Sequence, residues 1–180
     1  TGEKYPELRR RQEMVSRRVP GAYMTSVMDL GMYEDIHPKH KKEVGERLAL
    51  LARGKVYKEE LLCEPPALLG AERKGKKIIL HFAHAGVGLW RKEKTPEAEP
   101  EAELPSPLTG PREMKDGFLV LQGEKPLEIG KVRLWGNEVI LHVPSLSEEK
   151  CAVSFAQVPY VRVRIYNSAD LPMKPFYCEL

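Results

Sequence analysis

Apolar residues at helical spacing mark the first fifth of the chain. In residues 6–19, Leu8, Val15 and Val19 recur at intervals that bring them to one side of a helix, and Pro6 suits its first turn. The arginines of this stretch are mixed with glutamates, which is typical of a solvated helix face. We therefore expect a surface helix here, not a basic binding patch.

A second, more regular helix is predicted over residues 41–53. Its apolar residues fall at i, i+4, i+7 and i+8 and form one stripe: Val44, Leu48, Leu51 and Ala52. Gly54 follows as a helix stop signal.

Between the two helices the pattern predicts a short strand and a polar loop. Residues 22–27 are mostly apolar and follow a Pro-Gly pair, which is typical of a buried strand. An Asp-Leu-Gly turn comes at 29–31, and Pro38 predicts a helix boundary at His37, because proline favours an extended conformation in the residue before it. The order helix, strand, loop, helix indicates the last piece of an α/β domain over residues 1–60, with its parallel strands mostly elsewhere.

From about residue 61 the apolar period becomes two, as in strands with one buried face. The strand-like segments are 76–82, 118–121, 132–135, 138–143, 151–155 and 160–166. Gly136-Asn137 is a two-residue hairpin signal between two of them. Short strands with Gly and Pro turns predict an antiparallel β-sandwich over residues 61–180. The predicted fold class is mixed α and β: an α/β remnant plus this sandwich.

Residues 91–114 interrupt the strand pattern. They are rich in proline and glutamate and carry few apolar side chains that could form a core. We predict a mobile loop between strands.

Composition and charge narrow the function classes. With 29 Lys and Arg against 26 Asp and Glu, the net charge is +3, and the basic residues are interleaved with acids, which argues against a dedicated nucleic-acid surface. No apolar run approaches the roughly 20 residues of a membrane-spanning helix. Three widely spaced cysteines, Cys63, Cys151 and Cys178, argue against a zinc site and a disulfide framework, and leave one disulfide possible.

The loop before the second helix gathers a histidine and several carboxylates. Asp35, Glu34 and Asp29 precede His37 by two, three and eight residues. A carboxylate can fix the tautomer of an imidazole and stabilise its cation, while the other ring nitrogen takes a proton from a nucleophile. The spacing alone leaves two interpretations open: a hydrolase base, or an ordinary loop histidine near a helix N-terminus.

Several sequence motifs around this histidine resemble the C-terminal signature of the sialate O-acetylesterase family of SGNH-type esterases. The motifs are Asp29-Leu30-Gly31, Asp35-Ile36-His37-Pro38, Lys41 and Val44-Gly45-Glu46-Arg47-Leu48-Ala49. Near the end of the chain, the Leu171-Pro172 and Pro175-Phe176 pairs are similar to the last residues of that family's chains. The resemblance implies that His37 is the catalytic base of a Ser-His-Asp triad.

The triad acid is less defined by the resemblance. Related SGNH enzymes have an aspartate three residues before the histidine, where this chain has Glu34. We expect Asp35 to be the acid, with Glu34 and Asp29 as rivals.

The nucleophile has no candidate in the chain. Its serines, at positions 16, 26, 106, 145, 147, 154 and 168, lack the neighbouring glycines of a nucleophile elbow. In the family, the serine and its oxyanion-hole residues lie near the start of the catalytic domain. The chain also opens on Thr-Gly-Glu, without a Met or a signal peptide, so we expect it to be the C-terminal fragment of a longer protein.

The resemblance also implies the substrate and the location. We expect an O-acetyl ester of sialic acid or another glycan as substrate, the N-terminal portion of the same protein as partner, no metal or other cofactor, and a secreted or periplasmic parent. The chain alone would then be inactive. The alternative is a carbohydrate-binding or protein-docking β-sandwich without chemistry. Trp90, Trp135 and Tyr160 could serve such a module, although we expect them in the core.

Overall fold

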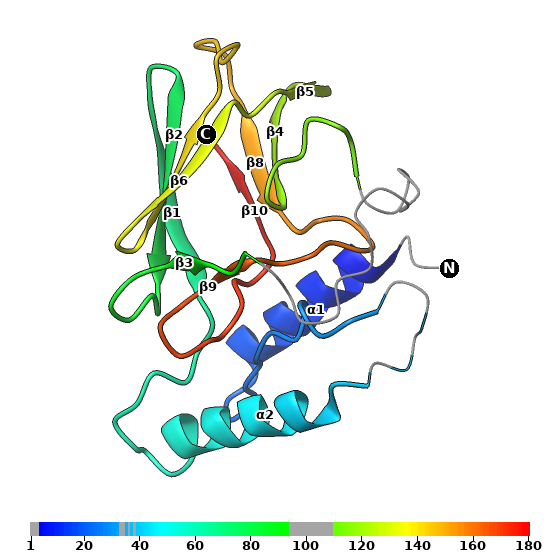
Figure 1. Ribbon diagram of the computed structural model, residues 1–180, viewed down its shortest axis with the longest axis vertical. Helices are drawn as coiled ribbons and strands as arrows, with labels where there is room; N and C mark the ends of the chain where they lie inside the picture. The colour runs from blue at the N-terminus through cyan, green and yellow to red at the C-terminus, as the bar shows by residue number, and fades with distance from the viewer. Residues whose placement is uncertain (1–3, 33–34, 36, 38, 94–109) are drawn as a thin grey trace.

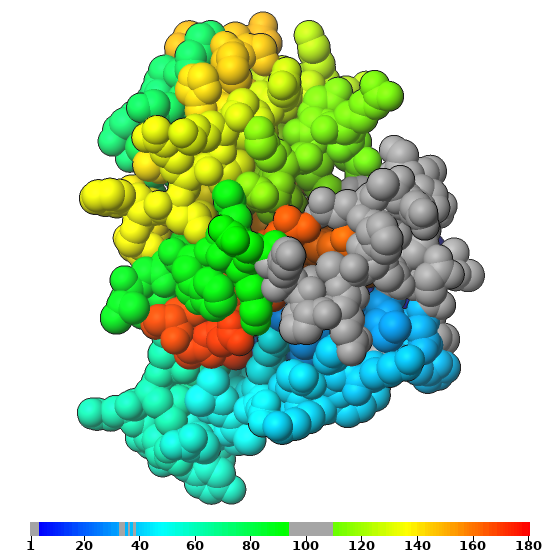
Figure 2. Space-filling view, viewed as in Figure 1, coloured from blue at the N-terminus to red at the C-terminus, as the bar shows by residue number. Residues whose placement is uncertain are grey.

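Two helices and a β-sandwich make up the fold in a computed structural model, which describes residues 4–32, 35, 37, 39–93 and 110–180 (Figure 1). The helices lie below the sandwich in this view, and α2 is the farther of the two from it. In the space-filling view, the orange-red segment around residue 168 lies between the green β3 region and the cyan α2 region (Figure 2). Among the described residues, no helix has the length and apolar character needed to cross a bilayer.

Both predicted helices are present. Helix α1 covers Tyr5–Arg18, with proline in its first turn, and α2 covers Lys41–Lys55. The predicted stop at Gly54 is wrong, because α2 continues through this residue. Gly54 has a different role: a Cβ placed there would collide with the side chain of Cys63. The glycine therefore allows close packing between the helix and the chain that follows it.

The segment over residues 22–27 is not a strand, so this prediction is wrong. It lies between α1 and α2 (Figure 1), but no described strand pairs with it, and Ser26 is its one buried residue. A strand needs a hydrogen-bonded neighbour, which sequence pattern alone does not guarantee.

The sandwich consists of two four-stranded antiparallel sheets. The first has the order β1-β2-β7-β6 and the second the order β10-β8-β4-β5, with a separate pair, β3-β9, next to the helices. The bounds are β1 Ala67–Lys74, β2 Lys77–Ala83, β3 Trp90–Arg91, β4 Phe118–Gln122, β5 Lys125–Leu127, β6 Lys131–Trp135, β7 Glu138–His142, β8 Ala152–Phe155, β9 Ile165–Tyr166 and β10 Phe176–Glu179. The predicted fold class, with helices of an α/β type and an antiparallel sandwich, is confirmed.

The register bears out most of the strand predictions. Trp135 pairs with Glu138 across the Gly-Asn turn, so the predicted hairpin is confirmed. The predicted strand at 160–166 is wrong over most of its length, because within the described part of the chain only its end, β9, forms a strand, paired with β3. Its alternation nevertheless holds: Val161, Val163 and Ile165 are buried.

One apolar core fills the space between the two sheets. Phe82 of β2 and Val139 of β7 face Phe118 of β4 and Phe155 of β8, and all are at most 1% exposed. Every fully buried member of this cluster lies within residues 78–173. The division into domains 1–60 and 61–180 remains a prediction.

The predicted mobile loop at 91–114 is mostly outside the described residues, which omit 94–109. The three cysteines are free thiols; Cys63 and Cys151 are buried.

Candidate active site

His37 and Asp35 lie together on the surface, in the loop that leads to α2. The Asp35 Oδ1 atom accepts a hydrogen bond of 2.7 Å from the backbone N–H of His37. The same oxygen lies 3.5 Å from His37 Nδ1. One carboxylate thus holds the backbone of the histidine and faces its ring, as an aspartate two residues upstream in a turn can do.

This arrangement makes the two ring nitrogens of His37 unequal. Nδ1 faces the carboxylate, and 82% of the side chain is exposed, so Nε2 is open to an incoming group. A histidine with one nitrogen held by a carboxylate and the other free has the chemistry of a general base. The 3.5 Å separation is longer than a hydrogen bond in a working triad, as is common before substrate binds.

Asp29, one of the rival acids, is engaged elsewhere. Arg47 of α2 donates to both of its oxygens, at 2.6 and 2.7 Å, and the Tyr166 hydroxyl donates to Oδ2 at 2.9 Å. The Asp29 side chain is only 5% exposed. Asp29 therefore joins the loop to α2 and to β9. Glu34, the other rival, lies outside the described residues.

Asp29 shifts the pKa values of both side chains that bind it. Burial lowers the pKa of Arg47, but the hydrogen bonds and charge of Asp29 outweigh it and raise that pKa above its ordinary value. Burial and the neighbouring Asp29 carboxylate raise the pKa of Tyr166 well above its ordinary value. A further bond of 3.0 Å, from Arg47 to the Ser26 carbonyl, ties α2 to the segment before the loop.

Sequence reasoning missed Arg47 and Tyr166 as partners of Asp29. Arg47 lies in the Val-Gly-Glu-Arg motif of the second helix, on the same face as its apolar stripe. A charged residue on an apolar helix face could have indicated a buried ion pair. Tyr166 is 137 positions from Asp29 in the chain, and nothing local indicates the contact.

The aromatic residues considered for sugar binding differ in burial. Trp135 is 76% exposed, so its expected place in the core is wrong. It lies at the end of the edge strand β6, and its cross-strand neighbour is Glu138. Trp90 is 39% exposed, donates to the Asn167 carbonyl and packs on the Tyr166 ring. Tyr160 is half-buried.

Comparisons with known proteins give a likeness of fold. No family model and no curated protein matches the sequence. Among solved structures, a carbohydrate acetylesterase from Xanthomonas citri is similar over 94% of this chain, with a TM-score of 0.71 and 24% sequence identity. This chain spans 35% of the length of that acetylesterase. The two proteins share a fold over this region.

Proposed function

We propose that this chain is the C-terminal part of a carbohydrate O-acetylesterase that resembles the sialate O-acetylesterases. The observation that carries the proposal is the His37–Asp35 pair, in which the carboxylate faces Nδ1 and Nε2 is open. The fold likeness to a carbohydrate acetylesterase supports the same reaction class. The substrate would be an O-acetyl ester of sialic acid or of another glycan, in a secreted or periplasmic parent.

The first half of the reaction would form an acetyl-enzyme. His37 Nε2 takes the proton of a serine hydroxyl that lies outside this chain, as the serine oxygen attacks the acetyl carbonyl. The tetrahedral intermediate then collapses, the bond from the acetyl carbon to the sugar oxygen breaks, and the imidazolium gives its proton to that oxygen. Asp35 stabilises the imidazolium without taking its proton.

The second half would restore the serine. His37 removes a proton from a water molecule as the water attacks the acetyl carbonyl, and then returns the proton to the serine oxygen, which releases acetate. Every proton is moved by His37, which is why its removal should cost more than that of Asp35.

The test compares this chain with the full-length parent on an acetylated sugar. This chain should be inactive with and without His37, because none of its serines lies in the nucleophile motif that His37 would serve. In the parent, His37→Ala should lower kcat by roughly 10³–10⁴-fold or more, and Asp35→Asn should cost less. Circular dichroism should show both variants folded, since neither side chain is buried.

Two outcomes distinguish an error in the esterase class from an error in the choice of the triad acid. If Glu34→Gln or Asp29→Asn in the parent costs more than Asp35→Asn with the fold intact, the triad acid is misassigned and the esterase class survives. If the parent keeps full activity as His37→Ala, the proposal fails.

A second candidate function is a carbohydrate-binding sandwich, and the exposed Trp135 favours it. An exposed indole can stack on the apolar face of a sugar ring, and Glu138 beside it can accept hydrogen bonds from sugar hydroxyls. His81, 3.2 Å from the Glu138 carboxylate, extends the same row of the sheet.

The second candidate is tested by binding alone. Trp135→Ala should weaken the affinity of this chain for glycans at least tenfold, as measured by isothermal titration. Tyr177→Ala is the matched control, because Tyr177 is a 54% exposed aromatic residue on the other sheet. Equal effects of the two changes would rule this function out.

A further inference from the structure

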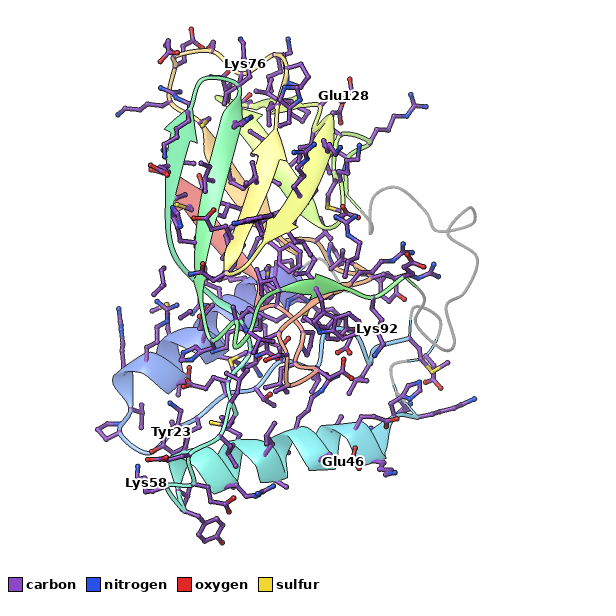
Figure 3. The ribbon with its side chains drawn as sticks, turned by 60° about the vertical axis from the view of Figure 1, so that its left-hand side comes forward. Tyr23, Glu46, Lys58, Lys76, Lys92 and Glu128 are labelled. Carbon is purple, nitrogen blue, oxygen red and sulfur yellow. The ribbon has the colours of Figure 1, made fainter. Side chains whose placement is uncertain are left out.

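A basic cleft lies between α1 and the sandwich. Figures 1 and 3 show α1 beside the end of the sandwich at which β1 and β10 begin, and residues of all three elements line the cleft. Its volume is about 380 Å³, which is within the size range of small-molecule sites. Its charged lining residues, among those described, are four basic and one acidic: Arg9, Arg10, Arg17, Lys174 and Glu13. His37 and Asp35 do not line the cleft, so it is separate from the candidate active site.

The acid of the cleft is already bound to one of its cations. The Glu13 carboxylate accepts a hydrogen bond of 2.7 Å from Arg17, one turn further along α1. These two opposite charges compensate each other. The charge of the cleft is therefore set by the other three cations, Arg9, Arg10 and Lys174.

The Lys174 ammonium is half-buried and has no direct acceptor in the described part of the chain. Two carboxylates attract it from a distance, those of Glu13 and Glu64. Glu13 is bound to Arg17, and Glu64 is bound to Lys55. Burial is the largest effect on the pKa of Lys174 and lowers it below its ordinary value. A partly desolvated cation without a direct partner would gain most from an anion that enters the cleft.

Two guanidinium groups lie in the same cleft, and no carboxylate of a described residue forms an ion pair with either. Arg9 donates through one terminal nitrogen to the carbonyls of Ala156 and Val158, at 3.2 and 2.6 Å. These neutral acceptors fix the position of the guanidinium but do not compensate its charge, and burial lowers the pKa of Arg9. Arg10 is exposed and makes no hydrogen bond to a described residue. Both arginines therefore keep N–H groups that an anion can accept from.

The neutral part of the lining suits a carbon skeleton with hydroxyl groups. Met14 of α1 is 40% exposed and Leu68 of β1 is half-buried, and both contribute an apolar wall. The half-buried Gln157 also lines the cleft, and its side-chain amide makes no hydrogen bond within the described residues. An amide both donates and accepts, as a hydroxyl group does. The cleft thus combines partners for a negative charge, for hydroxyl groups and for an apolar ring face.

We propose that this cleft binds a sugar that carries a carboxylate, such as a uronic or a sialic acid. The carboxylate lies among Lys174, Arg9 and Arg10, whose charge-assisted hydrogen bonds are stronger than those between neutral groups. The hydroxyl groups pair with Gln157, and the ring lies on the apolar wall. An inorganic anion would leave the amide and the wall unused, and a neutral sugar would leave the cations uncompensated. The site goes beyond the proposed function, because it neither contains nor requires His37.

Nuclear magnetic resonance titration of this chain with glucuronate tests the site, with glucose as the neutral control. Glucuronate should shift the side-chain signals of Gln157 and of Arg9 Nε–H. It should also bind at least about tenfold more tightly than glucose, because its carboxylate forms charge-assisted hydrogen bonds. Added salt should weaken the binding of glucuronate, since ions screen the cations of an open cleft.

Two variants remove the cations one at a time. Arg10→Met and Lys174→Met should each weaken the binding of glucuronate at least about tenfold. Arg10 is exposed on α1, so its replacement should leave the fold intact, which circular dichroism checks. Lys77→Met is the matched control, because Lys77 is an exposed lysine on β2, outside the cleft. A changed melting temperature with unchanged affinity would mean that Lys174 has a structural role only, and would overturn the site.

Four further results would overturn the proposal. They are equal affinities for glucuronate and glucose, equal affinities for glucuronate and inorganic phosphate, an equal loss of affinity in Lys77→Met, and a loss of affinity in Trp135→Ala. The last would place the sugar on the exposed sheet of the second candidate function, because Trp135 does not line the cleft. His37→Ala should leave the binding of glucuronate unchanged, so the acidic-sugar site stands even if the esterase proposal fails.

Discussion

Asp29 and Asp35 belong to the same loop, yet their surroundings differ. Asp29 is 5% exposed and bound by Arg47 and Tyr166, whereas Asp35 is 39% exposed and bound to the backbone of His37. A carboxylate that is held by a buried arginine stabilises the scaffold, and one beside an exposed imidazole can assist catalysis. The loop therefore combines a structural carboxylate with a candidate catalytic one.

The sequence predicted that Asp35 and His37 lie together, but not that Arg47 and Tyr166 bind Asp29. Asp35 and His37 are two residues apart, so local turn geometry brings them together and spacing was informative. The partners of Asp29 come from α2 and β9, and only the tertiary fold creates those contacts. Spacing in the chain therefore left Asp29 as a rival acid.

Removing Arg47 should destabilise the chain strongly. Arg47→Met leaves the Asp29 carboxylate buried without its cation, and breaking a buried pair in this way costs about 3–5 kcal/mol. Urea unfolding monitored by circular dichroism measures the change. Lys42→Met is the matched control: its pair with Glu46 is exposed and should contribute less than about 1 kcal/mol. Similar losses in both variants would contradict the structural role of Asp29.

Tyr166 should make stability depend on pH in the alkaline range. Its pKa is raised in the folded state, so its contribution is complete below the unfolded pKa of about 10 and decreases at higher pH, by up to about 1.4 kcal/mol per pH unit. Tyr166→Phe should cost about 1.5–3 kcal/mol at pH 7, because the hydrogen bond to a charged carboxylate is lost. Urea unfolding at pH 7 and pH 11 should show that this cost shrinks at the higher pH. A constant difference would mean that the hydroxyl titrates normally.

At the scale of elements, the spacing of apolar residues predicted the helices and strands whose buried face follows a regular period. Both helices and most strands of the sandwich follow it. It missed β1, whose register shifts between Leu68 and Gly70, so the alternation expected of a strand is broken there. It predicted a strand at 22–27, where the composition is suitable but no described neighbour provides a ladder.

Two glycines of α2 should respond in opposite ways to alanine. A Cβ at Gly45 meets nothing within 4 Å, so Gly45→Ala should stabilise the chain by about 0.5–1 kcal/mol through helix propensity. A Cβ at Gly54 would collide with Cys63, so Gly54→Ala should destabilise by about 1–3 kcal/mol through overpacking. Thermal unfolding of the two variants gives the comparison. Stabilisation by Gly54→Ala would show that α2 does not pack on Cys63.

At the scale of the whole molecule, the core and the helical part are held together by different forces. The buried apolar cluster belongs to residues 78–173, whereas the links to the first 60 residues are largely polar: Arg9 to two carbonyls and Asp29 to Tyr166. Apolar burial in the helical part is small, with Leu30 and Leu51 as its buried apolar residues among those described. The sandwich therefore has an apolar core of its own, whereas the position of the helices depends on their polar contacts with the rest of the chain.

The predicted domain boundary is therefore testable by truncation. Residues 61–180 alone should unfold in one cooperative transition, because the cluster between the two sheets is retained. The midpoint should be lower than that of the full chain, since each lost polar link contributes about 0.5–3 kcal/mol. In the intact chain, amides of α1 and α2 should exchange before those of β2 and β7, because their apolar side chains are more exposed. Calorimetry and hydrogen exchange check the two expectations. If residues 61–180 show no cooperative transition, or if helix and sheet amides exchange together, residues 1–60 are an integral part of the core and the boundary near residue 60 is not a domain boundary.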